Sequence, residues 1–266
     1  MGWSHHAAPG RELPPLERGF PAGAVLAVLV ERPTVTVQRV AAAGGDLVVK
    51  RYFFPRLGQR VRALHRHTWL GLAKPAREAR NLLRLGAAGA PALEPVAWGV
   101  LTRGVGIVHD GWLALPWLEG ARTLEQALLA GETLPADWWD RLGAALGKVH
   151  AAGCWYRNLA ARNVLLDEPA DATAPSPRGH LIDPAKSAWL PAPLEPGRAA
   201  ADLLLFGAPL AAALPPGAWA ALLAAHGAFA AEDDPRALEA QIPRELHRRI
   251  EPWLRRECAR FGAAAG

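Results

Sequence analysis

Two short stretches of the sequence carry side chains whose oxygen atoms suit a hard divalent cation. Asn158 and Asn163 stand five residues apart ahead of the apolar run Val164–Leu166, and Asp183 follows the next apolar pair. Magnesium and calcium take carboxylate and amide oxygens as ligands. Taken singly, Asp183 is also explained as a turn residue before Pro184, and Asn163 as an amide that caps a loop. Their joint position on either side of one strand-like run favours a shared site.

A strongly basic stretch, residues 50–84, begins at Lys50, one of only four lysines in the chain. It holds ten basic residues and one acid, Glu78, so its net charge is +9, whereas the rest of the chain is −4. Such a stretch favours a polyanionic partner, namely a nucleic acid, an anionic lipid or a phosphorylated small molecule; a solvated basic helix face is the alternative. No helix-turn-helix, zinc-finger or RNA-recognition signature accompanies it, so we expect no nucleic acid partner.

These stretches together resemble a known family. The sequence Tyr156-Arg157-Asn158-Leu159, with Asn163 four residues on and Ile182-Asp183 further along, is similar to the catalytic loop and metal motif of protein-kinase-like enzymes. Within that superfamily the pattern resembles the bacterial lipopolysaccharide core kinases, which phosphorylate Kdo or heptose sugars. The resemblance extends over about residues 45–190 and includes Lys50-Arg51-Tyr52, Glu78 and Gly89-Ala90-Pro91-Ala92.

The resemblance implies ATP and Mg²⁺ as cofactors and a role for each matching residue. Lys50 would neutralise the α- and β-phosphates of the nucleotide, and Glu78 would hold that lysine in place. Asn163 and Asp183 would be the amide and carboxylate ligands of magnesium. These roles suit phosphoryl transfer, which depends on positioning and charge neutralisation more than on covalent chemistry by the protein. For Lys50 the alternative is an ordinary surface lysine at a strand end.

The sequence also departs from the family's pattern. Asn158 stands where the family has the aspartate that accepts the proton of the substrate hydroxyl, and an amide has no usable basicity. Tyr156 replaces a histidine, Pro184 follows the metal aspartate in place of phenylalanine, and no glycine-rich phosphate loop precedes Lys50. Two hypotheses therefore stay open: an active sugar kinase in which Asn158 positions the acceptor, and a pseudokinase that binds ligands or partners without turnover.

Strands and helices that would position these residues follow from the sequence pattern. Alternating residues 34–40 and 46–52 predict a β-hairpin with Lys50 on its second strand, and residues 92–101 and 105–118 predict two more strands. A helix is expected from Pro75 to Gly86 or Gly89. The capping-box start Thr123-Leu124-Glu125-Gln126 predicts a short helix, and Pro135 opens another that ends at Gly153.

These elements divide into a sheet-rich first part and a helical second part. We expect a loosely ordered, Pro- and His-rich N-terminus over residues 1–20, a first lobe over 21–118 and a second lobe over 119–266. The second lobe would hold the catalytic-like loop 150–166 and the metal motif 181–184. The resemblance implies an α+β, protein-kinase-like two-lobe fold with a small β-rich N-lobe and a helical C-lobe.

Composition narrows the class of protein further. With 266 residues and 51% hydrophobic residues the chain is not intrinsically disordered as a whole, and two cysteines exclude a disulfide framework or a Cys-rich zinc module. No signal peptide is recognised at the N-terminus. The uncharged stretch Leu203–Ala231 contains prolines and many alanines, which favours a buried helix pair over a membrane span.

The expected partner and location follow from the resemblance. The partner would be a lipopolysaccharide core or lipid A intermediate, and residues 50–84 would contact an anionic membrane surface. The protein would be cytoplasmic and peripheral at the inner membrane. The sequence does not specify the oligomeric state.

Overall fold

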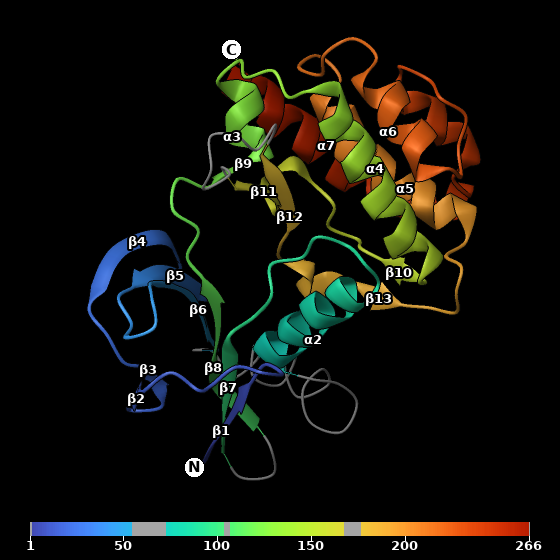
Figure 1. Cartoon of the computed structure of the whole chain (residues 1–266). Helices are drawn as coiled ribbons and strands as arrows, with labels where there is room; N and C mark the ends of the chain where they lie inside the picture. The colour runs from blue at the N-terminus through green and yellow to red at the C-terminus, as the bar shows by residue number, and fades with distance from the viewer. Residues whose placement is uncertain (1, 55–72, 104–106, 168–176, 266) are drawn as a thin grey trace. The chain divides into compact units, whose positions relative to one another are not determined.

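The structure is a computed structural model that describes residues 2–54, 73–103, 107–167 and 177–265. The chain divides into two compact units, Met1–Arg84 with Leu93–Leu118, and Leu85–Ala92 with Glu119–Gly266. The first unit is built on an antiparallel sheet and the second is mainly helical (Figure 1). This arrangement confirms the predicted α+β fold class. Compared with the predicted lobes, the short segment Leu85–Ala92 falls with the helical unit.

The first unit contains a six-stranded sheet in the order β1-β7-β8-β6-β5-β4, in which every neighbouring pair is antiparallel. The predicted hairpin is confirmed, because Val40 pairs with Leu47 at its turn and Val35 with Tyr52 at its open end. The strands are β1 (Gly2–Ala7), β4 (Val25–Arg32), β5 (Val35–Val40), β6 (Leu47–Phe53), β7 (Ala97–Arg103) and β8 (Ile107–Pro116).

The N-terminal segment is more ordered than the sequence predicted. Residues 2–7 form β1, which pairs with β7 from Gly2 opposite Thr102 to Ala7 opposite Ala97. Two short strands, β2 (Leu16–Glu17) and β3 (Phe20–Pro21), pair with each other. The prediction of a loosely ordered N-terminus over residues 1–20 is therefore wrong for these strands. The pairing partner of β1 lies about ninety residues away, so local composition did not indicate it.

Strand β4 forms one edge of the sheet (Figure 1). All eight of its residues are exposed, including Val25, Leu26 and Val28 at just over half of their accessible surface. The apolar residues Val25–Val30 thus lie on an edge strand of the sheet.

Helix α2 (Lys74–Ala87) covers the face of the sheet that carries Lys50 and Tyr52. Its start lies close to β8, since a Cβ added at Gly111 would meet Cγ of Pro75 at 2.8 Å. The helix begins one residue before the predicted start and ends between the two glycines proposed as its stop. Its position brings Glu78, in the second turn, against strand β6.

The second unit packs its helices around a continuous apolar core. Trp138, Trp139 and Trp219 are fully buried in it, so these tryptophans serve packing. The α-helices are α3 (Leu124–Leu129), α4 (Ala136–Ala151), α5 (Pro196–Gly207), α6 (Ala218–His226) and α7 (Arg244–Ala265). The capping box predicted for α3 is present, with Thr123 and Gln126 bonded to each other's backbone.

Short strands complete the second unit. They form one sheet in the order β12-β11-β9 and one pair, β10 with β13. The 3₁₀-helices are η1 (Ala161–Asn163), η2 (Pro184–Lys186), η3 (Ala208–Leu210) and η4 (Pro235–Gln241), and the strands are β9 (Arg122–Thr123), β10 (Cys154–Trp155), β11 (Val164–Asp167), β12 (Arg178–Leu181) and β13 (Ala188–Trp189).

The long uncharged stretch belongs to α5, α6 and the turns between them. Leu203, Leu204 and Leu222 are fully buried in the core of the second unit. Across the described ranges, no helix has the length and apolar character that crossing a lipid bilayer requires. The preference for a buried helix pair over a membrane span is confirmed.

Candidate functional site

The first group of predicted site residues forms around the carboxylate of Glu78. Lys50 Nζ on β6 lies 2.6 Å from Glu78 Oε1, and the hydroxyl of Tyr52 donates to Glu78 Oε2. Glu78 has no exposed surface, whereas the Lys50 side chain is 16% exposed. A buried carboxylate is tolerated when it is paired and hydrogen-bonded, and both conditions are met. The ammonium of Lys50 is thereby held in one place while keeping some access to solvent.

The alternation of strand β6 explains why Tyr52 joins this pair. Residues 50 and 52 point to the same face of the strand, which is the face that α2 covers. Lys74, the first residue of α2, places its Nζ 4.6 Å from the centre of the Tyr52 ring. A cation close to the ring adds to the positive field around Glu78.

The basic stretch 50–84 is only partly described. Arg51 pairs with Asp110 at 2.8 Å, so its charge, like that of Lys50, is balanced within the first unit. Residues 55–72, including Arg56, Arg60, Arg62 and Arg66, lie outside the described residues. The predicted contact of this stretch with an anionic surface therefore stays a prediction.

The second group of site residues lies on one loop of the helical unit. The loop leaves β10, passes through residues 156–160 and the single turn η1, and continues into β11. Strand β11 pairs with β12 from Val164 opposite Leu181 onward. This pairing places the end of β12, and Asp183 after it, beside the start of β11. The predicted strand between the two motifs is therefore the element that brings them together.

Asn158, Asn163 and Asp183 form one small cluster. Asn158 Nδ2 donates to Asp183 Oδ2 at 3.4 Å, and Asn163 Nδ2 donates to the carbonyl of Asn158 at 2.7 Å. The backbone N–H of Ile182 donates to the carbonyl of Asn163 at 2.9 Å. Nδ2 of Asn163 already donates to the carbonyl of Asn158. Oδ1 of Asn163 is therefore the atom suited to a cation. Asn158 and Asn163 are both buried.

Two residues of this region have left-handed backbone conformations. Arg157 has φ of 63° and Asp183 has φ of 58°. Such conformations cost on the order of 1 kcal/mol for residues other than glycine, less for aspartate, and they concentrate at functional sites. The loop therefore adopts a shape that its neighbours must hold in place.

Tyr156 is one of those neighbours. Its side chain is buried, and its hydroxyl donates to the carbonyl of Ile182 at 2.6 Å. Ser187, after η2, donates its hydroxyl to the carbonyl of Tyr156 at 3.1 Å. Tyr156 thus ties the loop to the segment that carries Asp183.

Asp202 is the second neighbour, and sequence reasoning missed it. It lies on α5 with no exposed surface, and its two oxygens accept the backbone N–H groups of Tyr156 at 2.6 Å and Arg157 at 2.8 Å. Two charge-assisted bonds hold the strained part of the loop. The available signal was a lone acid directly before the uncharged stretch, in a helix that otherwise contains one charged residue, Arg198.

The oxygen-bearing side chains of the second group fit one kind of cation. In the described ranges, no cluster of three or more His, Cys, Asp or Glu side chains suits a metal ion. One carboxylate and one amide, from Asp183 and Asn163, do not make a zinc site. They do suit Mg²⁺, which keeps several waters and is held by one or two carboxylates together with phosphate oxygens.

Two surface cavities of the second unit differ in their relation to the loop. One, of about 470 Å³, is lined by Trp155, Gln241 and Leu246 among others. Arg157 and Arg198 place their guanidinium carbons 4.8 Å and 5.2 Å from the Trp155 ring centre. The first cavity thus adjoins the loop that carries Asn158.

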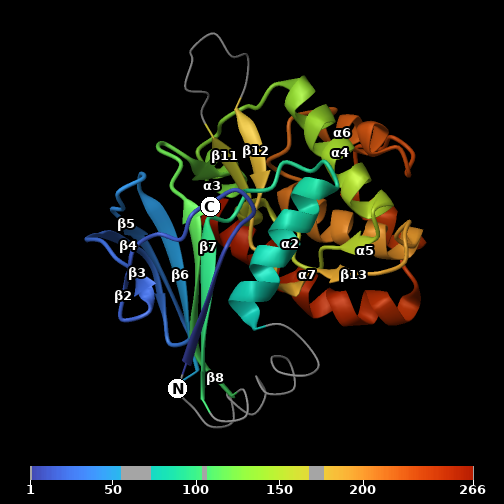
Figure 2. The same cartoon turned by 60° about the horizontal axis from the view of Figure 1, so that its bottom comes forward.

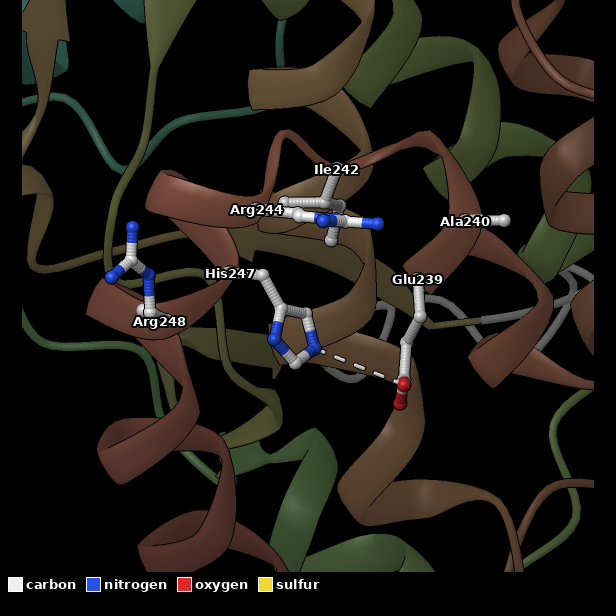
Figure 3. A pocket seen from close by; sticks show the side chains of 6 residues that line it. All are labelled: Glu239, Ala240, Ile242, Arg244, His247 and Arg248. Atoms are coloured by element: carbon white, nitrogen blue, oxygen red, sulfur yellow. Dashed lines mark ion pairs between the residues drawn. The ribbon is translucent and has the colours of Figure 1, made fainter.

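The other cavity, of about 680 Å³, lies at the start of α7 (Figure 3). Figure 3 shows the His247 ring directed toward Glu239. Nε2 of His247 lies 3.8 Å from Oε2 of Glu239. Its lining contains none of the predicted site residues. This cavity therefore does not belong to the predicted site.

Comparison with known proteins agrees with the motifs. The model of the lipopolysaccharide kinase (Kdo/WaaP) family matches residues 29–189, more than half of the chain. A 3-deoxy-D-manno-octulosonic acid kinase of Haemophilus influenzae (strain PittEE) is 30% identical over 104 residues, which are 39% of this chain and 43% of the relative. The enzyme of strain PittGG is 32% identical over 87 residues, 33% and 36% of the two chains. The matches thus span less than half the length of these relatives.

A solved structure supports the fold. It is described as WaaP in complex with acyl carrier protein, and it matches with a TM-score of 0.54, covering 88% of each chain. Its sequence identity is 16%, so this likeness shows the fold alone. The family match covers both Lys50 with Glu78 and the loop with Asp183. This chain therefore belongs to the lipopolysaccharide kinase (Kdo/WaaP) family.

Proposed function

We propose that this protein is an ATP-dependent kinase that phosphorylates a Kdo or heptose hydroxyl of the lipid-linked lipopolysaccharide core. The observation that carries the proposal is the cluster of Asn158, Asn163 and Asp183, held by the buried Asp202. Membership of the lipopolysaccharide kinase family supports it. The name of the Haemophilus influenzae relatives makes a Kdo sugar the first acceptor to test.

Each group of predicted site residues would have its own role toward the nucleotide. The ammonium of Lys50, fixed by Glu78, would neutralise phosphate charge. Asp183 and Oδ1 of Asn163 would hold Mg²⁺, which supplies neutralisation of the charge that develops on the transferred phosphoryl group. The first unit thus offers a fixed cation, and the second offers hard oxygen ligands.

The acceptor would depend on Asn158. Its amide can orient a hydroxyl by hydrogen bonding but cannot take the proton. Loss of a general base lowers a rate by about 10²–10⁴-fold. Since phosphoryl transfer relies on positioning and electrostatics, a slow kinase is compatible with an amide at this position.

Direct assay tests the proposal. Purified protein is incubated with Mg-ATP and a Kdo-containing lipid A precursor, and phosphate transfer to the sugar is measured by mass spectrometry. We expect transfer by the wild type and a loss of at least 100-fold in Asp183→Ala. Circular dichroism of the variant checks its fold. Transfer no greater than that of Asp183→Ala, with either a Kdo or a heptose acceptor, would refute the activity.

A second candidate is a pseudokinase that binds ligand without turnover in lipopolysaccharide assembly. It is favoured by one contact, in which the amide of Asn158 donates to the carboxylate proposed to bind the metal. Nucleotide binding, measured by calorimetry with and without Mg²⁺, tests this candidate on wild type and Lys50→Ala. Binding without transfer, together with activity created by Asn158→Asp, would select it. Turnover in the wild type that Asn158→Asp leaves unchanged would exclude the idea that the missing base limits the rate.

Location follows from the proposed acceptor. A lipid-linked substrate would bring the protein to the cytoplasmic face of the inner membrane, with residues 50–84 at the anionic surface. Flotation with vesicles that contain anionic lipid measures this contact. Replacing Arg56, Arg60 and Arg62 by glutamine should weaken flotation, and the loss should grow at low salt. Equal flotation of both proteins would remove the basic stretch from the proposal.

A further inference from the structure

Two buried histidines are connected, through Asp202, to the loop that carries Asn158. His150, near the end of α4, and His226, the last residue of α6, are 3% and 8% exposed. Nδ1 of His150 and Nε2 of His226 are 2.8 Å apart. On its other side, Nε2 of His150 lies 3.5 Å from Oδ2 of Asp202, the carboxylate that holds the loop. A row of polar groups therefore runs from α6 to the backbone of Tyr156 and Arg157, in which the contact between His150 and Asp202 is an electrostatic one and not a hydrogen bond.

The packing of two helices sets the distance between the histidines. Helices α4 and α6 lie side by side in both views (Figures 1 and 2). A Cβ added at Gly143 would meet the carbonyl of Leu222 at 2.1 Å, and one at Gly147 would meet that of His226 at 2.7 Å. Glycines four residues apart on one face of α4 thus let the backbones come close. This close approach brings His226 within hydrogen-bond distance of His150.

The protons in this chain can be placed by elimination. A bare lone pair on Nε2 of His150 would face the carboxylate of Asp202, so this nitrogen carries a proton although the contact is long. When the His150 ring carries this one proton, its Nδ1 is unprotonated, and the 2.8 Å contact then requires an N–H on Nε2 of His226. Burial, and to a smaller extent His150, lower the pKa of His226 to about 4, so His226 is neutral near pH 7.

We infer that His226 is a positioning residue: its Nε2–H fixes the tautomer of His150 and, through Asp202, the shape of the loop that carries Asn158. Helix α6 lies outside the stretch that matches the family model. The site residues predicted from sequence include neither His226 nor Asp202. The inference concerns the order of the loop, so it holds for an active kinase and for a pseudokinase alike.

Hydrogen exchange of the loop amides tests the inference without relying on turnover. We expect His226→Leu to speed exchange at the N–H groups of Tyr156 and Arg157 about fivefold, the effect of losing one net hydrogen bond. His226→Gln keeps a donor and should restore slow exchange. Leu223→Ala, a buried change on the same helix, is the matched control and should leave these two amides unchanged.

Two outcomes would overturn the inference: unchanged exchange in His226→Leu, or the same increase in Leu223→Ala. If His226→Leu does not fold, ¹⁵N NMR of labelled histidines in the wild-type protein decides the matter. We expect His150 protonated on Nε2 only and His226 on Nε2 only. A proton on Nδ1 of His150 would contradict the inference.

Discussion

At the scale of single residues, the buried carboxylate of Glu78 depends on its partners for compensation of its charge. It has no exposed surface, and its partners are Lys50 and Tyr52. Removing one partner of a buried ion pair leaves an uncompensated charge, which costs about 3–5 kcal/mol. We therefore expect Lys50→Met to lower the free energy of unfolding in urea by about that amount.

The double variant Lys50→Met with Glu78→Gln separates structure from chemistry in this pair. Because no buried charge is left, it should recover most of the lost stability while remaining unable to bind nucleotide through Lys50. A double variant as unstable as Lys50→Met would show that the pair matters for packing and not through its charge.

Asn158 invites a different test, because its amide lies 3.4 Å from the carboxylate of Asp183. Asn158→Asp would bring two carboxylates together, and like charges at that distance repel. We expect the thermal stability of Asn158→Asp to fall at pH 7 and to recover on adding Mg²⁺, by more than the wild type gains. Scanning calorimetry with and without Mg²⁺ measures this, with Asn158→Ala as the control. Equal Mg²⁺ effects in both variants would argue against a cation bound jointly by Asp183 and the side chain at position 158.

How far the site could be predicted differs between its residues. Asn163 and Asp183 were identified as a pair because both flank an apolar run, and the structure brings them together through β11 and β12. Lys50 and Glu78 were identified by the resemblance to the kinase family, supported by the rarity of lysine in the chain and of acids in their stretch, and they pair directly. Asp202 was missed because a single acid in a helix carries no spacing signal.

At the scale of elements, the contact between α4 and α6 depends on glycine. A Cβ at position 147 would come within 2.7 Å of a backbone carbonyl, which cannot rotate away as a flexible side chain would. Gly147→Ala should therefore lower the free energy of unfolding by about 1–3 kcal/mol. It should also speed amide exchange at Tyr156, because His226 is moved from His150.

A second glycine provides the control for that prediction. Gly262 lies on α7, and a Cβ there would meet nothing within 4 Å. Gly262→Ala should stabilise the protein by up to about 1 kcal/mol through helix propensity. Chemical unfolding of both variants gives the comparison. A stabilised Gly147→Ala would mean that the helices do not approach as closely as described.

The elements that could be predicted from the sequence are those whose signals lie within a few neighbouring residues. The hairpin of β5 and β6 has alternating residues around a Gly-Gly turn, and α3 has its capping box in the sequence. Strand β1 has neither, and its pairing with β7 joins residues far apart in the chain. Its order comes from that long-range pairing, which no window of neighbouring residues contains.

At the scale of the whole molecule, the division into a sheet-based unit and a helical unit was predictable from the change of pattern near Gly120. What was not predictable is how the second unit holds its loop. Tyr156, Asp202 and the two histidines form a buried polar network inside an apolar core. Each member looks ordinary in the sequence, and only tertiary packing brings them into contact.

That network makes the stability of the whole chain depend on pH in a defined direction. Burial lowers the pKa of His226 to about 4, from an ordinary value of 6.5. Between these values the unfolded chain binds a proton that the folded chain resists, so stability falls as the pH drops below about 6.5. The loss attributable to His226 should reach about 2 kcal/mol between pH 7 and pH 5 and should level off below pH 4.

Comparison with His226→Gln isolates this contribution. Both proteins also contain His180 and Glu257. Burial lowers the pKa of His180. Burial alone would raise the pKa of Glu257, but its arginine partners lower it. Their effects therefore cancel when the two pH profiles of unfolding free energy in urea are subtracted. The wild type should lose about 2 kcal/mol more than His226→Gln between pH 7 and pH 5. Parallel profiles would mean that the pKa of His226 is the same in the folded and the unfolded chain.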